Sequence, residues 1–181
     1  MNMRVRILLL NILFFVTILN AQEKGSFTDI RNGKTYQTIQ INGTTWMTEN
    51  LNYKIESDLW CTPYKSRDCN KWGQLYSWET AQSVCPDGWH LPSKSEFEEL
   101  ISPYGDNKED IYAAIKKDGE SGFNAWLAGD GSPNGNYSGC GTYGYYWTST
   151  EKDSLKAWVL ILTDYDNWVS VYHSHKNKGK S

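Results

Sequence analysis

Residues 85–100 read CPDGWHLPSKSEFEEL and place a tight turn directly before a strongly signalled helix. The Pro-Asp-Gly tripeptide at 86–88 is turn chemistry, because proline fixes its own φ and glycine accepts left-handed backbone angles. Ser93 and Glu96 have the spacing of a capping box, which satisfies backbone N–H groups that the first helical turn leaves without partners. The stretch therefore predicts a bend that stops at Ser93 and a helix that begins immediately after it.

The bend carries the motif Trp89, His90, Leu91 and Pro92. Trp89 and Leu91 are large apolar residues that we expect to enter the core on either side of His90. A histidine in such a place is either a general acid or base or a hydrogen-bonded structural residue. No serine or cysteine nucleophile pattern accompanies His90, so the structural interpretation is favoured.

Apolar residues recur at helical spacing in three segments. After the capping box they form one stripe, made of Phe97, Leu100, Ile101 and Tyr104. Two more helices are predicted, over residues 73–85 and over residues 108–117.

Strand patterns fill the rest of the chain. Residues 34–46 alternate on either side of an Asn-Gly pair at 42–43, which is typical of a β-hairpin with a type I′ turn. Four later segments have strand composition and are separated by turn residues: 122–129, 143–150, 155–163 and 167–175. Two or three helices in the first half, an early hairpin and later strands predict the α+β class with an antiparallel sheet.

The first residues predict export. Arg4 and Arg6 precede an apolar run over 7–19 that is too short to span a bilayer and ends next to Ala21. A membrane anchor is the alternative, but two asparagines interrupt or bound the run. We expect a signal peptide over residues 1–21, a single domain over 22–181, no transmembrane anchor, and a secreted or cell-surface location.

Charge and composition narrow the class of protein. The net charge is −3, and it falls to −5 once the signal segment with its two arginines is removed. This balance offers no basic surface for nucleic acid or an anionic membrane. Aromatic residues make up 14% of the chain, with nine Trp and twelve Tyr. Such composition favours a turn-rich fold whose rings fill a core or line a surface.

The four cysteines of an exported chain indicate disulfides before anything else. Cys61 and Cys69 are close in sequence, and a small stapled loop is the preferred pairing. Cys85 and Cys140 then remain, paired with each other or with something absent. The spacings lack the close cysteine pairs of a zinc site, and no metal or cofactor is expected.

Three blocks carry a resemblance to a known family: GKTYQTIQINGTTWMTENLNY (33–53), WGQLYSWETAQSVCPDGWHLPSKSEFEEL (72–100) and YGYYWTSTE (143–151). They resemble the Fibrobacter succinogenes major paralogous domain family, which occurs in secreted and surface proteins of that bacterium and of Bacteroidetes. The resemblance runs from about Phe27 to the last residue. The segment 90–100 is also similar, more distantly, to formylglycine-generating enzymes, and that similarity implies a C-type-lectin-like core.

The chain departs from the family pattern at its end. Members typically continue into a final strand of the type S-V-R-C-V-K, whereas this chain stops at Ser181. The cysteine of that strand is the partner that the resemblance implies for Cys85. We therefore expect either a fold truncated at its final strand or a Cys85–Cys140 pairing.

Candidate ligand-binding residues come from the aromatic and Gly-rich region 135–147, GNYSGCGTYGYYW, and from the turn TDYDNW. Interleaved rings and small residues are typical of adaptable binding loops. The alternative is that the rings begin a core strand, which we favour for Trp147. The candidates are Tyr137, Tyr143, Tyr145 and Trp168.

Two metal hypotheses are weighed and set aside. His173 and His175 would share a face of a strand, but no third ligand lies at motif spacing. The acidic residues at 164–166 have the chemistry of calcium ligands, and a hairpin turn is the simpler interpretation.

The sequence thus predicts a secreted, non-catalytic module that binds extracellular carbohydrate or a surface protein. Two alternatives stay open. One is an enzyme related to formylglycine-generating enzymes with a reactive Cys140, which lacks a companion cysteine at the required spacing. The other is a purely structural module of the cell envelope.

Overall fold

A computed structural model of the chain describes residues 22–55 and 69–181. The predicted signal peptide over 1–21 lies outside these residues. Cys61, and with it the predicted Cys61–Cys69 staple, also lies outside them.

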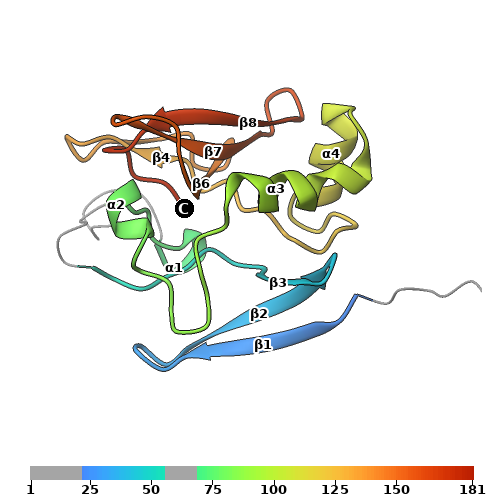
Figure 1. Cartoon of the computed structure of the whole chain (residues 1–181), viewed down its shortest axis with the longest axis horizontal. Coiled ribbons are helices and arrows are strands. Elements are labelled where there is room, and N and C mark those ends of the chain that lie inside the picture. The colour runs from blue at the N-terminus through green and yellow to red at the C-terminus, as the bar shows by residue number, and fades with distance from the viewer. Residues whose placement is uncertain (1–21, 56–68) are drawn as a thin grey trace, which may run out of the picture.

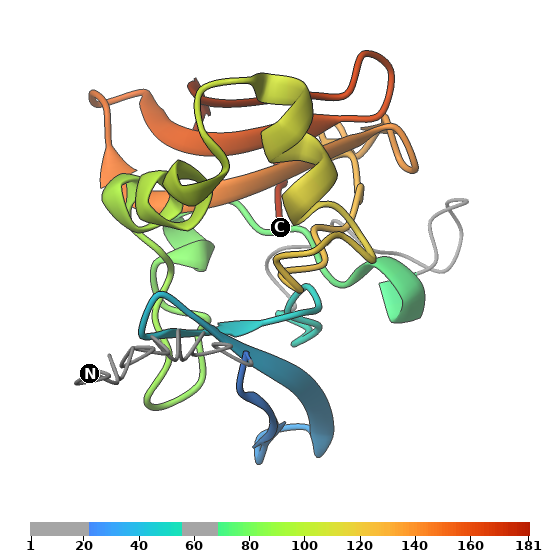
Figure 2. The same cartoon turned by 90° about the vertical axis from the view of Figure 1, so that its right-hand side faces the viewer.

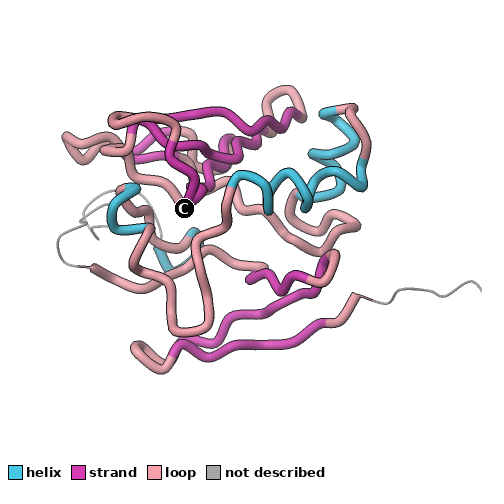
Figure 3. The backbone as a smooth tube through the Cα atoms, in the orientation of Figure 1, coloured by secondary structure: helices cyan, strands magenta, loops and turns pink. Residues whose placement is uncertain are grey.

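Eight β-strands in three antiparallel sheets make up most of the regular structure in the described ranges (Figures 1 and 3). The first sheet contains β1 (Lys24–Asp29), β2 (Lys34–Ile41) and β3 (Thr44–Met47). A small hairpin follows, with β4 (Asp130–Gly131) and β5 (Tyr137–Ser138). The third sheet contains β6 (Tyr143–Glu151), β7 (Lys156–Thr163) and β8 (Trp168–His175).

The helices are short. They are α1 (Cys69–Trp72), α2 (Trp78–Ala81), α3 (Lys94–Ile101), a 3₁₀ turn η1 (Ser102–Tyr104) and α4 (Lys108–Ile115). No described α-helix exceeds eight residues. The predicted α+β class with a C-type-lectin-like core is therefore wrong, since the described chain is mainly antiparallel β-structure with minor helices.

One reason for the low helix content is that the helix predicted over 73–85 is much shorter than expected. Only Trp78–Ala81 is helical, because the backbone of Tyr76 is engaged by another part of the chain. Tyr76 N–H donates to the Lys180 carbonyl at 2.8 Å, and Lys180 N–H donates to the Tyr76 carbonyl at 2.9 Å. This long-range pairing keeps the chain before Ser77 from forming the first helical turns.

The strand predicted over 122–129 is also absent. Asn124 has a φ of +56° and Gly129 a φ of +70°, which an extended strand does not adopt. Ala125 alone pairs, through an isolated bridge to Lys116. Strand β1 and the short hairpin β4–β5 were in turn not predicted.

Local signals were read correctly elsewhere. The β2–β3 hairpin closes at the pair Ile41 and Thr44, with φ values of +51° at Asn42 and +80° at Gly43. The Ser93 and Glu96 capping box is formed at the start of α3. Strands β6 to β8 and helix α4 also lie close to their predicted ranges.

The β6–β7–β8 sheet has a hydrophobic cluster on each face. One cluster joins Leu160, Leu162 and Val169 to residues of α3 and α4 and to Trp46 of β3. The other joins Trp147 and Val159 to Tyr76, Ala81 and Val84. Figures 1 and 2 show this sheet at one end of the molecule and the β1–β3 sheet at the other. The space between the two sheets holds the candidate site.

Candidate functional site

A cavity of about 530 Å³ lies between the β1–β3 sheet and the β6–β8 sheet. Its walls are β3 with the residues that follow it to Leu51, the bend at 84–92, the start of α3, residues 123–125 and the middle of β6. This volume lies within the range of roughly 300–1,000 Å³ that is usual for small-ligand sites.

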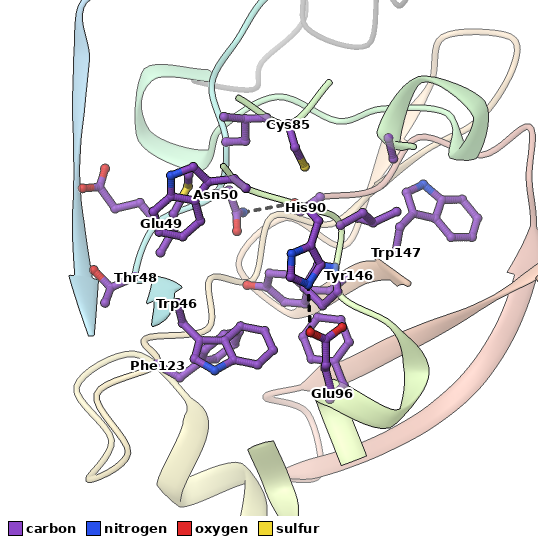
Figure 4. A pocket seen from close by; sticks show the side chains of 18 of the residues that line it. Trp46, Thr48, Glu49, Asn50, Cys85, His90, Glu96, Phe123, Tyr146 and Trp147 are labelled. Carbon is purple, nitrogen blue, oxygen red and sulfur yellow. Dashed lines mark hydrogen bonds and ion pairs between the residues drawn. The ribbon is translucent and has the colours of Figure 1, made fainter. Parts of the chain in front are cut away.

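Aromatic rings form much of the cavity wall (Figure 4). Trp46 contacts Phe123 edge-on, with 5.4 Å between ring centres and an angle of 83°, and lies 5.5 Å from Phe97. Phe123 lies 6.1 Å from Tyr146. The hydroxyl of Tyr146 donates to the Trp126 carbonyl at 2.8 Å, so its polar atom is satisfied by the backbone. Burial raises the pKa of Tyr146 well above its ordinary value.

Asn50 supplies a fixed amide at the opposite wall. The residue is 9% exposed, and its Nδ2 donates to the Trp72 carbonyl at 2.9 Å and to Ser181 Oγ at 3.0 Å. Both amide hydrogens are therefore committed, and the orientation of the side chain is set. Asn50 thus ties the cavity wall after β3 to the last described residue.

His90 and Glu96 lie together at the cavity. The His90 Nε2 and Glu96 Oε1 atoms are 2.8 Å apart, and the other carboxylate oxygen, Oε2, accepts from Ser93 N–H at 2.6 Å. Burial opposes ionisation of Glu96, but the hydrogen bonds from Ser93 and His90 outweigh it and hold its pKa below the usual value. Glu96 is thus one residue with two roles, as the helix cap and as the partner of His90.

The bend motif is only partly buried. Trp89, Leu91 and Pro92 are half-buried, and the His90 side chain is 69% exposed. The expectation that Trp89 and Leu91 enter the core holds in part, because Leu91 packs against the Trp147 cluster. Trp89 instead contacts Phe27 of β1, at 5.1 Å between ring centres.

Cys85 lines the same cavity with a free thiol. Figure 4 shows its sulfur turned toward the space above Tyr146. Burial raises the pKa of this thiol, and the nearby charge of Arg31 offsets the effect only in part. Cys85 is not bonded to Cys140, so a Cys85–Cys140 disulfide is wrong for this structure. Cys140 lies on an exposed turn between β5 and β6 and does not line the cavity.

The predicted ligand-binding residues lie elsewhere. Tyr143, Tyr145 and Trp168 share one face of the β6–β8 sheet, because Tyr143 pairs with Thr163 and Thr163 with Trp168. The Tyr143 and Tyr145 rings stack at 5.9 Å and 17°. Tyr137 lies in the β4–β5 hairpin. None of these four residues lines the cavity.

The bend motif (Trp89, His90, Leu91 and Pro92) and Cys85 line the cavity. Sequence reasoning missed its other lining residues, chiefly Trp46, Asn50, Phe123 and Tyr146. The local signal nearest to them is the W-x-x-E-N-L run at 46–51, which belongs to the segments that resemble the family. Trp147 is fully buried, as expected for a core residue.

His173 packs against aromatic rings. It stacks on Tyr172 at 4.2 Å and lies edge-on to Trp158 at 6.0 Å. In the described ranges no three His, Cys, Asp or Glu side chains come together as metal ligands would. Residues 164–167 form the turn between β7 and β8, with a φ of +52° at Asn167.

No helix within residues 22–55 and 69–181 is long and apolar enough to cross a membrane.

Comparison with known proteins gives one family. The model of the Fibrobacter succinogenes major domain matches residues 39–180, which include the cavity wall from β3 to the residue before Ser181. No curated protein and no solved structure matches the chain. Since the family model covers most of the sequence, this chain belongs to the Fibrobacter succinogenes major domain family.

Proposed function

We propose that this chain is an exported, non-catalytic binding module, and that the cavity between β3 and β6 is its ligand site. The observation that carries the proposal is the cavity itself, a space of about 530 Å³ with aromatic walls and few polar groups. Apolar sites with a small number of oriented polar atoms are the usual form of ligand sites in proteins. Export rests on the basic and apolar pattern of residues 1–21.

The chemistry of the polar groups favours binding over catalysis. Glu96 is held as a carboxylate by the helix cap and by His90, which leaves it a poor proton donor near neutral pH. The raised pKa of Cys85 keeps its thiol protonated, and the thiolate is the nucleophilic form. Glu96 and Cys85 therefore fit a role in shaping the cavity and in hydrogen bonding to a ligand better than a role in catalysis.

A test needs a variant that narrows the cavity. Leu91 is half-buried and lines the cavity at the bend, so Leu91→Trp places a larger ring in that space. Gln40→Trp adds the same ring on an exposed position of β2 and serves as the control. Ligand-observed NMR with uncharged aromatic fragments should detect binding to the wild type and to Gln40→Trp, and reduced binding to Leu91→Trp. Equal binding to all three proteins would contradict the assignment of the site.

Glycan recognition is a second candidate, at a different place. Tyr143, Tyr145 and Trp168 are partly exposed and share a sheet face, and such amphipathic rings offer flat surfaces to sugars. A glycan array on the folded protein tests this candidate. Signals that vanish in Tyr143→Ala and Trp168→Ala but persist in Leu91→Trp would assign the ligand to the sheet face.

A further inference from the structure

The outer edge of β3 is open along the cavity. In the β1–β3 sheet, β3 pairs only with β2. The hairpin closes at Ile41 and Thr44, and Thr48 N–H donates to the Gln37 carbonyl at 2.9 Å. Backbone groups of alternate residues point to the same side of an antiparallel strand, so residues 44, 46 and 48 face β2. The N–H and C=O groups of Thr45 and Met47 therefore face away from β2.

Both outward-facing residues line the cavity. Among the described residues, neither backbone forms a hydrogen bond in the β2–β3 register or elsewhere. Unpaired backbone groups along a strand edge are a template for another strand. The opposite walls of the cavity are aromatic. The side chains of an added strand that point into the cavity would therefore contact aromatic rings.

The β6 side of the cavity is occupied differently. Trp147 N–H donates to the Ser181 carbonyl at 2.9 Å, and Ser181 N–H donates to the Tyr145 carbonyl at 3.0 Å. Ser149 N–H donates to the Pro92 carbonyl at 2.8 Å. These contacts already use the edge of β6, so of the two strand edges that reach the cavity, the edge of β3 is the one with open backbone groups among the described residues.

From this geometry we propose that the ligand of the cavity is an extended segment of a partner polypeptide, which adds as a fourth strand to the outer edge of β3. This inference rests on the proposed function. Strand addition gives affinity through main-chain hydrogen bonds and specificity through pockets for alternate side chains. The edge of β3 is four residues long, about 13 Å, which suits a segment of four to six residues.

The register predicts the anchor residue of the segment. The residue that pairs with Trp46 has its side chain on the same face as Trp46, which is the face that contacts Phe123 and Phe97. A large apolar or aromatic side chain is expected there. The carboxylates of the cavity lining already have partners, because Glu49 lies 3.3 Å from the Lys34 ammonium group and Glu96 lies 2.8 Å from His90 Nε2. The lining therefore sets no charge requirement on the flanks of the segment.

A second copy of this chain is a poorer occupant. Its own β3 is backed by β2 and β1, and a complete sheet does not enter a space of about 530 Å³. A single added strand has to place only its anchoring side chain inside that space.

The test uses a fluorescent pentapeptide, Lys-Val-Phe-Val-Lys with blocked ends, and the folded full chain. Wild-type protein should raise its fluorescence anisotropy. N-methylation of the amides that face β3 should weaken binding about tenfold or more, whereas N-methylation of the outward-facing amides should change it less than about threefold. Equal effects of the two methylation patterns would overturn strand addition.

Variants of the protein give an independent arm. Thr45→Pro removes the N–H group at the open edge, where proline is tolerated because no ladder bond to β2 is lost. It should weaken peptide binding about tenfold, and Thr45→Ala, which keeps the N–H group, should weaken it less than Thr45→Pro does. If Thr45→Pro fails to fold, the methylated peptides on the wild type still decide the question.

The two proposals fail in distinguishable ways. Aromatic fragments that bind the wild type and not Leu91→Trp, with no binding of any form of the peptide, would keep the ligand site and reject strand addition. Self-association of the chain at the concentrations used, abolished by Thr45→Pro, would replace the partner polypeptide with a second copy and so reject the proposal as stated.

Discussion

The ammonium group of Lys180 lies 4.1 Å from the centre of the Tyr145 ring, although Lys180 is only 2% exposed. The Trp147 ring lies 5.5 Å from the same group, and the carboxylate of Asp130 lies 3.8 Å away. Burial lowers the pKa of Lys180 to about 8, and the attraction of Asp130 offsets this only in part. The chain segment that pairs with Tyr76 therefore carries a cation that its surroundings tolerate poorly.

Replacement of Lys180 by methionine should stabilise the fold at neutral pH. In the unfolded chain the pKa of Lys180 returns to 10.5, so folding favours the neutral amine between about pH 8 and 10.5, and wild-type stability gains with rising pH over that range. The advantage of Lys180→Met should be on the order of 3 kcal/mol at pH 7 and should shrink toward pH 10. Urea unfolding at pH 7, 8, 9 and 10 measures it.

The control for this measurement is Lys178→Met. Lys178 also lies near Asp130, at 3.9 Å, but is half-exposed. Its replacement should change stability at pH 7 much less than the replacement of Lys180 does. Titration of Cys85 and the buried tyrosines is common to all three proteins and cancels in the differences. A Lys180→Met advantage that stays constant from pH 7 to 10 would refute the explanation.

The capping box of α3 gives a second prediction. Ser93 Oγ accepts from Glu96 N–H at 3.2 Å, and Ser93 N–H donates to Glu96 Oε2. Ser93→Ala removes the first bond and should lower the free energy of unfolding by about 1 kcal/mol at pH 7. Because the pKa of Glu96 is lowered in the fold, its contribution is present above the unfolded pKa and is lost as the pH falls below about 4.5.

The matched change for Ser93 is Ser95→Ala. Ser95 lies in the same first turn and is exposed, and its hydroxyl contacts only Ser93 Oγ among the described residues. It should cost a few tenths of a kcal/mol at most, within the range of ordinary surface substitutions. If both alanine variants unfold at the same urea concentration, the box does not stabilise α3.

Features set by neighbours in sequence were predictable. The Asn42-Gly43 turn, the Ser93 cap and the strand composition of β7 each depend on a few adjacent residues, and each is found where expected. The prediction of a helix over 73–85 was wrong because the backbone of Tyr76 is hydrogen-bonded to Lys180, about a hundred residues further along the chain. No local pattern reports such a pairing.

The aromatic part of the candidate site was missed for the same reason. Trp46, Phe123 and Tyr146 come from three separate parts of the chain and meet only after the two sheets are placed. The sequence pointed instead to Tyr143 and Tyr145, whose spacing within one strand is visible without a fold. In the structure these two rings stack on one face of β6 and do not line the cavity.

Gly73 makes a third prediction, about the wall that holds Asn50. Its φ is +76°, and an added Cβ would lie 2.5 Å from the Asn50 Cβ and 3.0 Å from two backbone oxygens. Gly73→Ala should therefore destabilise through both backbone strain and displacement of Asn50. Gly43 has a φ of +80° with nothing near an added Cβ, so Gly43→Ala measures backbone strain alone, about 1–2 kcal/mol.

The difference between the two glycine variants isolates the clash. We expect Gly73→Ala to be less stable than Gly43→Ala by a further 1–3 kcal/mol, roughly the cost of overpacking. Because Asn50 binds Ser181 Oγ, the amide signals of Ser181 should also shift in Gly73→Ala and not in Gly43→Ala. Similar stabilities for the two variants would show that Asn50 shifts to accommodate the added methyl group at little cost.

The last prediction concerns the alkylation rate of the Cys85 thiol, which depends on its burial and on access through the cavity. Alkylation proceeds through the thiolate, and burial raises the pKa of Cys85 in the fold. Iodoacetamide at pH 7.5 should therefore label Cys85 several-fold more slowly in the native protein than in urea, as measured by mass spectrometry of the peptide that contains it. Leu91→Trp, which narrows the cavity that Cys85 lines, should slow native labelling further, while Gln40→Trp should leave it unchanged. A Cys85 peptide found joined to the Cys140 peptide without reduction would contradict the free thiol, and native labelling as fast as in urea would contradict its burial.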